Sequence, residues 1–350
     1  MKILCKLSGI HPSLPSEEII GILESESIPY KIIKQLKQII ILEITNSNYE
    51  SVINRAAFSK SIYQFLFETS SDLEMIKENL NSINLDQFVR NKKSFMVRIE
   101  KIKSDSLKDD YISSEDLESK IGNLILNLTN QSLKVDLKNP DLTFKGFIIK
   151  DKLLFGIKLG QIDLEPLHKR SGPKKAYFHP CGLDPKFARM MVNLAGIDLN
   201  SVIYDPHCGI GSILIEAGLI GYRVMGSDIS WKMIHGSRVN LNHYKISDFE
   251  IFRAESGHLP IKKIDCIITD PPYGRSSPVE GNSIIGLYKK FLNNCREIVH
   301  KDNKIVFAAP KRLEDKINEI LKSYNFIVDK KFDFYIHRSL IRNLWIIRLI

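Results

Sequence analysis

The stretch Asp205-Pro206-His207-Cys208-Gly209-Ile210-Gly211-Ser212 decides the fold of this chain. It separates a short apolar run at Val202–Tyr204, which predicts a strand, from a helical pattern at Ile213–Leu219. Glycines at positions 209 and 211 allow the backbone to turn tightly and to approach a ligand closely. Such a loop between a strand and a helix is typical of an open α/β sheet that binds its ligand at the carboxyl ends of its strands.

Strand and helix patterns alternate around this loop, from residue 184 to the end of the sequence. A helix is expected at Pro185–Gly196, with proline in its first turn and apolar residues on one face. The other expected strands and helices are Arg223–Gly226, Trp231–Tyr244, Ile251–Arg253, Cys266–Thr269, Leu287–Val299, Lys304–Ala308 and Leu313–Tyr324. This alternation predicts a mostly parallel, doubly wound sheet. The last strands, Phe326–Phe334 and Asn343–Leu349, have no helix between them and predict an antiparallel edge hairpin.

The residues around the loop favour S-adenosylmethionine as its ligand. Asp228 ends the second expected strand, where a carboxylate can accept the hydroxyls of a ribose. A glycine loop followed by such an acid also occurs in dinucleotide sites, but Leu214 stands where their third glycine would be. Asp205 would repel a pyrophosphate, whereas it suits the ammonium and sulfonium groups of S-adenosylmethionine. The pattern therefore predicts the methyl donor rather than NAD.

Five further residues belong to the expected donor site. Ile229 follows the second-strand carboxylate, and Glu255 and Ser256 follow the third expected strand, where an acid can bind the adenine amino group. A solvated loop glutamate is the alternative interpretation for Glu255. His207 and Cys208 suggest a base and a nucleophile, but methyl transfer to nitrogen needs no covalent intermediate. We therefore expect these two residues to shape the methionine pocket.

The sequence Asp270-Pro271-Pro272-Tyr273-Gly274, after the fourth expected strand of this half, indicates the chemistry. The exocyclic amine of a nucleobase is a poor nucleophile because its lone pair is delocalised into the ring. The Asp270 carboxylate and the Pro271 carbonyl can accept its two hydrogens, which favours a pyramidal nitrogen with an available lone pair. Pro271 and Pro272 stiffen the turn, and Tyr273 offers the base a ring for stacking. Taken alone, the motif also fits a plain proline turn; its position after a donor loop favours amine methylation.

The first 160 residues are predicted to form two small α/β units. Residues 1–70 alternate as strand, helix, strand, strand, helix, strand, which is the ferredoxin-like pattern. Residues 71–160 combine helices near Asp72–Asn81 and Glu115–Leu128 with strands between Phe95 and Lys158. Residues 161–178 are expected to be a basic linker, and residues 179–350 the α/β domain with the donor loop.

Composition and charge limit the classes of protein and of partner. The net charge is +9, and residues 1–165 hold 22 Lys and Arg against 23 Asp and Glu, while residues 166–350 hold 28 against 18. The positive excess therefore lies with the donor loop, as expected for contact with a phosphate backbone, although a merely soluble basic surface also fits. The five cysteines include no C-x-x-C pair and indicate neither a disulfide framework nor a zinc site. No apolar run is long enough for a membrane helix and no signal-peptide core is present, so we expect a cytoplasmic protein.

The chain resembles the THUMP-bearing amino-methyltransferases of RNA, and within them the archaeal tRNA (guanine-10-N2)-dimethyltransferases. Besides the two motifs quoted above, the resemblance rests on residues 135–157, 179–180, 185–195, 226–229 and 337–342. It implies a THUMP RNA-binding domain, a Rossmann-like class I methyltransferase domain, S-adenosyl-L-methionine as cofactor and methylation of the N2 of guanine 10 in tRNA. The sequence departs from the family pattern at His207, where Phe is usual, and at Ile210, where Thr is usual.

The resemblance also implies partners. The expected substrate is tRNA, bound by its phosphates and shape, and some relatives use a small zinc-binding activator subunit. We expect a monomeric catalytic chain without a metal of its own and without membrane association. The basic residues expected to contact RNA are Arg90, Lys92, Lys93, Lys169, Arg170, Lys174, Lys175, Arg275 and Arg338.

Three other functions stay open on the sequence alone. The first is methylation of a guanine elsewhere in tRNA or in ribosomal RNA, with the same residues in the same roles. The second is methylation of DNA adenine, which also uses the D-P-P-Y motif, but the N-terminal RNA module argues against it. The third is a non-catalytic RNA-binding scaffold, which the presence of Asp205, Gly209, Gly211, Asp228 and Asp270 disfavours.

Overall fold

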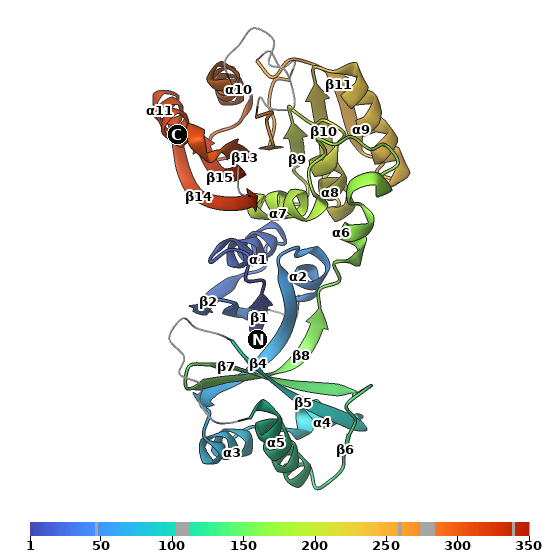
Figure 1. Cartoon of the computed structure of the whole chain (residues 1–350), viewed down its shortest axis with the longest axis vertical. Helices are drawn as coiled ribbons and strands as arrows, with labels where there is room; N and C mark the ends of the chain where they lie inside the picture. The colour runs from blue at the N-terminus through green and yellow to red at the C-terminus, as the bar shows by residue number, and fades with distance from the viewer. Residues whose placement is uncertain (46–47, 103–112, 258–260, 274–283, 338–339, 350) are drawn as a thin grey trace. The chain divides into compact units, whose positions relative to one another are not determined.

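The computed structural model describes residues 1–45, 48–102, 113–257, 261–273, 284–337 and 340–349. The chain forms two compact units, coloured along the sequence in Figure 1. The first unit consists of Met1–Pro12, Tyr30–Ile53 and Ser59–Ile162, and the second of Ser13–Pro29, Asn54–Phe58 and Asp163–Ile350. The chain therefore passes between the units more than once.

The first unit contains one eight-stranded sheet in the order β2-β3-β1-β4-β8-β7-β5-β6. Its first half consists of β1 (Lys2–Leu7), β2 (Tyr30–Leu36), β3 (Ile39–Ile44) and β4 (Ser59–Ser70), and α2 (Glu50–Arg55) precedes β4. β1 pairs antiparallel with both β3 and β4, and β2 pairs antiparallel with β3. The strand order and directions are those of the ferredoxin-like pattern that the sequence predicted.

The second half of this sheet follows without a break, because β8 pairs with the long strand β4. Its strands are β5 (Ser94–Lys101), β6 (Lys134–Val135), β7 (Leu142–Ile149) and β8 (Lys152–Gln161), and its helices are α3 (Leu73–Asn81), α4 (Asp86–Val89) and α5 (Ser114–Leu128). Asp72 begins α3 by accepting hydrogen bonds from the backbone N–H groups of Glu74 and Met75. Apolar residues of α3 and α5, such as Ile76 and Ile121, are buried against the sheet.

The second unit is built on a seven-stranded sheet in the order β11-β10-β9-β12-β13-β15-β14. The strands are β9 (Val202–Asp205), β10 (Arg223–Asp228), β11 (Phe249–Arg253), β12 (Cys266–Thr269), β13 (Lys304–Pro310), β14 (Phe326–His337) and β15 (Leu340–Leu349). The pairs from β11 to β13 are parallel, whereas β15 is antiparallel to both β13 and β14. The predicted parallel sheet and antiparallel hairpin are confirmed, with the last strand lying between β13 and β14.

Helices cover both faces of this sheet. The core on one face includes α7 (Pro185–Ala195), α8 (Ser212–Ile220) and α9 (Trp231–His243), and the core on the other includes α10 (Ile284–Ile298) and α11 (Glu314–Ser323). Along β12, Ile268 belongs to the first core and Ile267 to the second, as expected for side chains that alternate across a strand. The two buried faces explain why the strands read as unbroken apolar runs. No helix within the described ranges is long and apolar enough to cross a bilayer.

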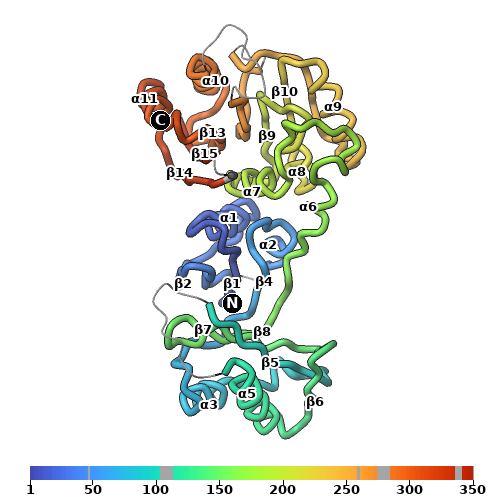
Figure 2. Tube along the Cα trace, in the orientation of Figure 1, coloured from blue at the N-terminus to red at the C-terminus, as the bar shows by residue number. Residues whose placement is uncertain are grey.

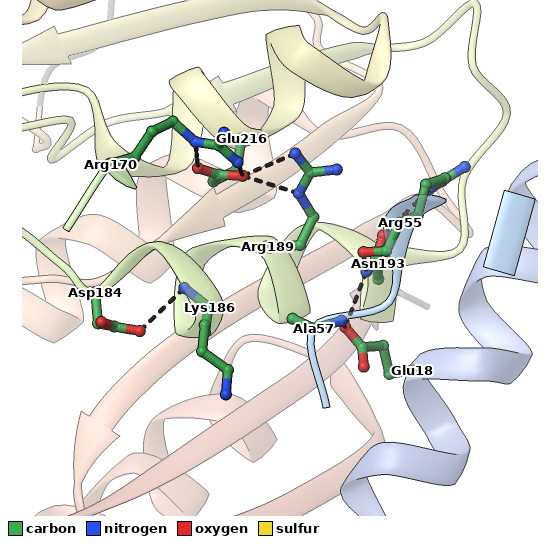
Figure 3. A network of polar contacts seen from close by, with 9 residues as sticks. All are labelled: Glu18, Arg55, Ala57, Arg170, Asp184, Lys186, Arg189, Asn193 and Glu216. Atoms are coloured by element: carbon green, nitrogen blue, oxygen red, sulfur yellow. Dashed lines mark hydrogen bonds and ion pairs between the residues drawn. The ribbon is translucent and has the colours of Figure 1, made fainter. Parts of the chain in front are cut away.

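The helix α1 (Leu14–Ser25) belongs to the second unit, although it follows the first strand of the other unit. Figure 2 traces α1 beside α7, and a Cβ at Gly21 would overlap the carbonyl oxygen of Asn193 in α7. The buried Glu18 carboxylate accepts hydrogen bonds from the backbone N–H of Ala57 and from Asn193 Nδ2 (Figure 3), each at 2.9 Å. It also accepts the backbone N–H of Phe58 at 2.9 Å. Residues 13–29 and 54–58, expected within a unit of residues 1–70, thus pack with the second sheet. The other predicted domain boundaries stay predictions.

Candidate active site

The loop from Asp205 to Ser212 joins the carboxyl end of β9 to α8. Cys208 N donates to Ser227 O at 2.9 Å, and Gly211 N donates to Cys208 O at 2.8 Å. Gly209 and Gly211 have φ of +52° and +82°, in the left-handed region that glycine tolerates. A Cβ at Gly211 would lie 2.6 Å from Ser237 Oγ, whereas nothing lies within 4 Å of the Cβ position at Gly209. The loop is therefore packed on its α9 side and leaves room beside the Gly209 backbone.

The Asp205 carboxylate lies under this loop in a buried position. It accepts a hydrogen bond from Thr269 Oγ1 at 2.6 Å and another from the backbone N–H of His207 at 3.0 Å. Burial raises the pKa of Asp205 to about 7. A cationic ligand nearby would favour the ionised carboxylate, so this site suits the ammonium and sulfonium of S-adenosylmethionine.

Asp228, at the end of β10, connects the loop to the start of α9. Its carboxylate accepts hydrogen bonds from Gly209 N at 3.1 Å and from Ser230 N at 2.9 Å, and burial raises its pKa. Each carboxylate oxygen keeps capacity for a further donor such as a ribose hydroxyl. The neighbouring Ile229 and Trp231 are 61% and 62% exposed and offer apolar surface to a flat adenine ring. These residues fit the nucleoside part of S-adenosylmethionine.

His207 and Cys208 do not have the properties of a base and a nucleophile. Burial lowers the pKa of His207 to about 3 and raises the pKa of the Cys208 thiol, so both side chains are neutral. The His207 ring lies 3.2 Å from Thr269 Oγ1 through Nδ1 and packs edge-on against Phe291. The two residues therefore act as packing elements of the loop.

Glu255 and Ser256 follow β11 at the side of the sheet next to α10. The Glu255 carboxylate is exposed and lies 3.4 Å from Lys290 Nζ, and the Ser256 carbonyl accepts from Asn294 Nδ2 at 3.2 Å. Both residues are therefore tied to α10, and their contact with an adenine stays a prediction. Within the described ranges, no group of three or more His, Cys, Asp and Glu is arranged to hold a metal ion.

Asp270 and Tyr273 occupy the turn after β12, beside the donor loop. The strand order reverses between β9 and β12, which is where an open α/β sheet binds its ligand. Burial raises the pKa of Asp270 to about 6, and one of its oxygens accepts a hydrogen bond from Tyr273 Oη. The first residue of the turn, Pro271, is buried, and Pro272 is half-buried. The four residues of the motif therefore lie together at the end of β12.

Arg342 of β15 is the residue of this site that the sequence analysis did not single out. Its Nη1 lies 3.4 Å from Asp270 Oδ2, and its guanidinium lies over the Tyr273 ring, 4.8 Å from the ring centroid. Arg342 shares its face of β15 with the buried Leu344 and Ile346. In the sequence, the signal for a functional role of Arg342 is that a charged residue stands where the alternation of this strand calls for an apolar one. Arg338, which the sequence led us to expect as an RNA contact, lies outside the described residues, as Arg275 does.

Two residues of the basic linker are wrongly predicted as RNA contacts. Lys175 is buried, and its Nζ donates to Ser212 Oγ at 2.7 Å and to Leu183 O at 3.5 Å; burial lowers its pKa to about 8. Arg170 makes a two-point ion pair with the buried Glu216, which also binds Arg189 (Figure 3). Both cations are directed into the protein and cannot meet a phosphate on its surface. The exposed candidates are Arg90, Lys92, Lys93, Lys169 and Lys174.

Comparisons with known proteins agree with this geometry. An RMKL-like methyltransferase domain matches residues 173–328, and a THUMP domain matches residues 70–158. The tRNA (guanine(10)-N2)-dimethyltransferase of Methanothermobacter thermautotrophicus is 35% identical over 99% of both chains. The enzyme of the same name from Methanocaldococcus jannaschii is 31% identical over 98% of this chain and 99% of its own. TrmN from Thermus thermophilus shares the fold, with a TM-score of 0.57, 17% identity and full coverage of both chains.

Proposed function

The chain belongs to the family of the tRNA (guanine(10)-N2)-dimethyltransferases, and we propose that it methylates the N2 of guanine 10 in tRNA, with N2-methyl- and N2,N2-dimethylguanosine as products. The observation that carries the proposal is the Asp270–Tyr273 turn at the end of β12, adjacent to the donor loop of β9. A soluble tRNA substrate is consistent with a cytoplasmic enzyme.

The chain's own residues hold the methyl donor on the β9 side. S-adenosylmethionine supplies, when bound, a methyl group activated by its sulfonium charge. Asp228 accepts the ribose hydroxyls, Asp205 compensates the positive charge, and the open backbone at Gly209 allows close approach. Ile229 packs against the adenine. Glu255 and Ser256 are proposed for its amino edge.

The target amine is held on the β12 side. Asp270 and the Pro271 carbonyl accept the two hydrogens of N2, which favours a pyramidal nitrogen whose lone pair is no longer delocalised into the ring of guanine. Tyr273 stacks on the flipped base, and Pro272 keeps the turn rigid. Positioning of this kind supplies a large part of the rate enhancement. The Asp270 carboxylate, which burial makes more basic, is the group that can take the proton released after methylation.

The RNA is proposed to contact both units. The first unit contains the part matched by the THUMP model, with Arg90, Lys92 and Lys93 exposed near the start of β5. In the second unit, Lys174 and Lys169 are exposed, although Lys169 also pairs with Glu165 at 2.9 Å. Phosphate contacts from such residues give affinity without base specificity.

The test is to incubate the purified chain with an unmodified tRNA transcript and labelled S-adenosylmethionine, then identify the nucleosides by mass spectrometry. N2-methyl- and N2,N2-dimethylguanosine at position 10 are the expected products. Methylation of a guanine at another tRNA position or in ribosomal RNA would support the N2 methylation reaction but contradict guanine 10 as its target. A chain that binds the donor but is inactive on every RNA would indicate the small zinc-binding activator as a required partner.

A further inference from the structure

One side chain, Arg342, contacts both groups that the proposed function assigns to the substrate base. Its Nη1 lies 3.4 Å from Asp270 Oδ2, and its guanidinium covers the Tyr273 ring at 4.8 Å. The other Asp270 oxygen accepts the Tyr273 hydroxyl. The acceptor side of the site is therefore closed by the protein's own side chains.

The side chain of Arg342 is more buried than that of an arginine in an ordinary surface ion pair. Its side chain is only 14% exposed, and its Nε has no hydrogen-bond partner among the described residues. A buried guanidinium normally has its N–H donors satisfied, because leaving one unpaired costs free energy. An incompletely bonded guanidinium can therefore leave this position at lower cost than a fully bonded one.

A guanidinium and the amino edge of guanine are chemically similar. In guanine, N1, C2, N2 and N3 form a planar carbon bonded to three nitrogens, and N1 and N2 present neighbouring N–H donors on one side. Arginine presents the same planar fork of donors, which fits a carboxylate, and its flat face stacks on aromatic rings. Adenine and 2-aminopurine carry an amine beside a ring nitrogen that accepts, so they cannot offer two neighbouring donors to one carboxylate.

We propose that Arg342 is an internal placeholder for the guanine base, which must displace its guanidinium from Asp270 and Tyr273 to enter the site. This inference rests on the proposed function and adds a specificity role for Arg342. Guanine offers the carboxylate two neighbouring donors in place of the single contact from Arg342 Nη1, whereas a base with one donor offers only one. Because Arg342 competes with the base inside the bound tRNA complex, guanine still enters the site while a base with one donor is largely kept out, which selects guanine over other bases that carry an exocyclic amine.

Besides Tyr273, the guanidinium of Arg342 already contacts a second aromatic ring. The guanidinium lies 5.5 Å from the ring centroid of Phe187, a buried residue of α7. Cation–π contact with Phe187 can continue after contact with Tyr273 is lost. The backbone carbonyl of Tyr273 accepts a hydrogen bond from Arg312 Nη2 at 3.3 Å, which holds the turn that carries the ring.

The exchange also changes the environment of Asp270. The Arg342 charge lowers the pKa of Asp270 against the larger effect of burial, and the other titratable groups around it are Tyr273, Asp205 of β9 and Tyr288 of α10. When neutral guanine takes the place of the cation, the carboxylate becomes more basic. The displacement therefore prepares Asp270 to take the proton.

The first test measures occupancy without turnover. Methylguanidine is titrated by NMR into the wild-type protein, R342A and the double variant R342A/D270A. Binding to R342A alone, at millimolar concentration, is the expected result, because only this variant has an empty position beside an intact carboxylate. Failure of methylguanidine to bind R342A would overturn the placeholder. Binding of S-adenosylhomocysteine by each variant checks that it is folded, and R342S, which also leaves the position empty, replaces R342A if that variant is not.

The second test measures base selection. Single-turnover methylation is compared for transcripts with guanine or 2-aminopurine at position 10, using the wild type, R342A and R342K. We expect the preference for guanine to fall about ten-fold in R342A, as for loss of one specific base contact, and less in R342K. An equal loss of rate on both transcripts, with an unchanged preference, would assign Arg342 a structural role only. Methylation by the wild type at a nucleotide other than guanine 10 would instead contradict the proposed function, while the methylguanidine result would stand.

Discussion

The carboxylates at the ends of β9 and β12 belong to neighbouring strands but are held in different ways. Asp205 accepts the backbone N–H of His207 and the hydroxyl of the strand residue Thr269. Asp270 is instead contacted by the side chains of Tyr273 and Arg342. The donors to Asp205 come from the loop backbone and from a β-branched residue inside a strand, whereas both contacts of Asp270 come from long side chains that can change rotamer. The site for the methyl donor is therefore already formed, whereas the site for the guanine base has to open before the base can enter.

The largest expected effect comes from removing the acceptor carboxylate. Asp270→Ala should lower the methylation rate about 1,000-fold or more, because the amine loses both its hydrogen-bond acceptor and its proton acceptor. The affinity for S-adenosylhomocysteine, measured by calorimetry, should stay nearly unchanged, because the donor contacts are on β9 and β10. Asp248→Asn, at an exposed position, is the control and should retain activity. A rate in Asp270→Ala close to that of the wild type would remove Asp270 from the mechanism.

The framework beneath the donor loop should be sensitive to loss of one buried charge. Glu216 of α8 is 1% exposed and pairs with Arg170 and Arg189, so Glu216→Gln leaves two buried cations without their partner. We expect the free energy of unfolding to fall by about 3 kcal/mol, the scale for breaking a buried ion pair. Urea unfolding measures the effect. The matched control is Glu165→Gln, in an exposed pair with Lys169, which should change little. Equal stability of the two variants would contradict a rigid donor framework.

Removal of Asp228 should weaken binding at the site of the methyl donor. Asp228→Ala removes the carboxylate that orients Gly209 and accepts the ribose, and should weaken S-adenosylhomocysteine binding about ten- to hundred-fold, the scale of a charged hydrogen bond. The methylation rate at saturating donor should fall much less. A variant with normal donor affinity and a large loss of rate would reverse the assignment of the two sides.

The pH dependence of methylation should reflect the protonation of Asp270. Burial raises the pKa of Asp270 to about 6, so protonation removes the acceptor as the pH falls through that value. The value of kcat/KM for tRNA at saturating donor, which reports the free enzyme with Arg342 in place, should therefore decrease below about pH 6. In Arg342→Gln the loss should begin at higher pH, because the cation that lowers the Asp270 pKa is gone. An unchanged acid limb in that variant would place another group in control of the profile.

The smallest expected effect is on tRNA binding, where two adjacent lysines should behave differently. Lys174 is exposed and Lys175 is buried against Ser212. Lys174→Ala should weaken tRNA binding slightly and lower the slope of log affinity against log salt by about 1, as for one phosphate contact. Lys175→Met should leave that slope unchanged. Filter binding over a salt series tests both, and a reduced slope in Lys175→Met would show that its ammonium reaches RNA.

The sequence predicted the sheet because its strands read as apolar runs that end at chemically informative residues. Asp205, Asp228 and Asp270 were found this way, since each follows directly from the end of a strand. Contacts between segments distant in sequence were not predictable by the same reasoning. The packing of Glu18 against Ala57 and Asn193, the inward direction of Lys175 and Arg170, and the approach of Arg342 to Asp270 all depend on tertiary structure. A basic residue in a linker has no local signal that separates a buried ion pair from an RNA contact.

Methyl incorporation into two tRNA transcripts that differ by one amino group tests most directly whether N2 of guanine 10 is the methylated atom. One carries guanine at position 10, and the other carries inosine, which has the same ring system without N2. The account predicts two methyl groups per tRNA on guanine 10 and none on the inosine transcript. Methyl incorporation into the inosine transcript, or at another nucleotide of the guanine transcript, would contradict the assignment of N2 of guanine 10 as the target.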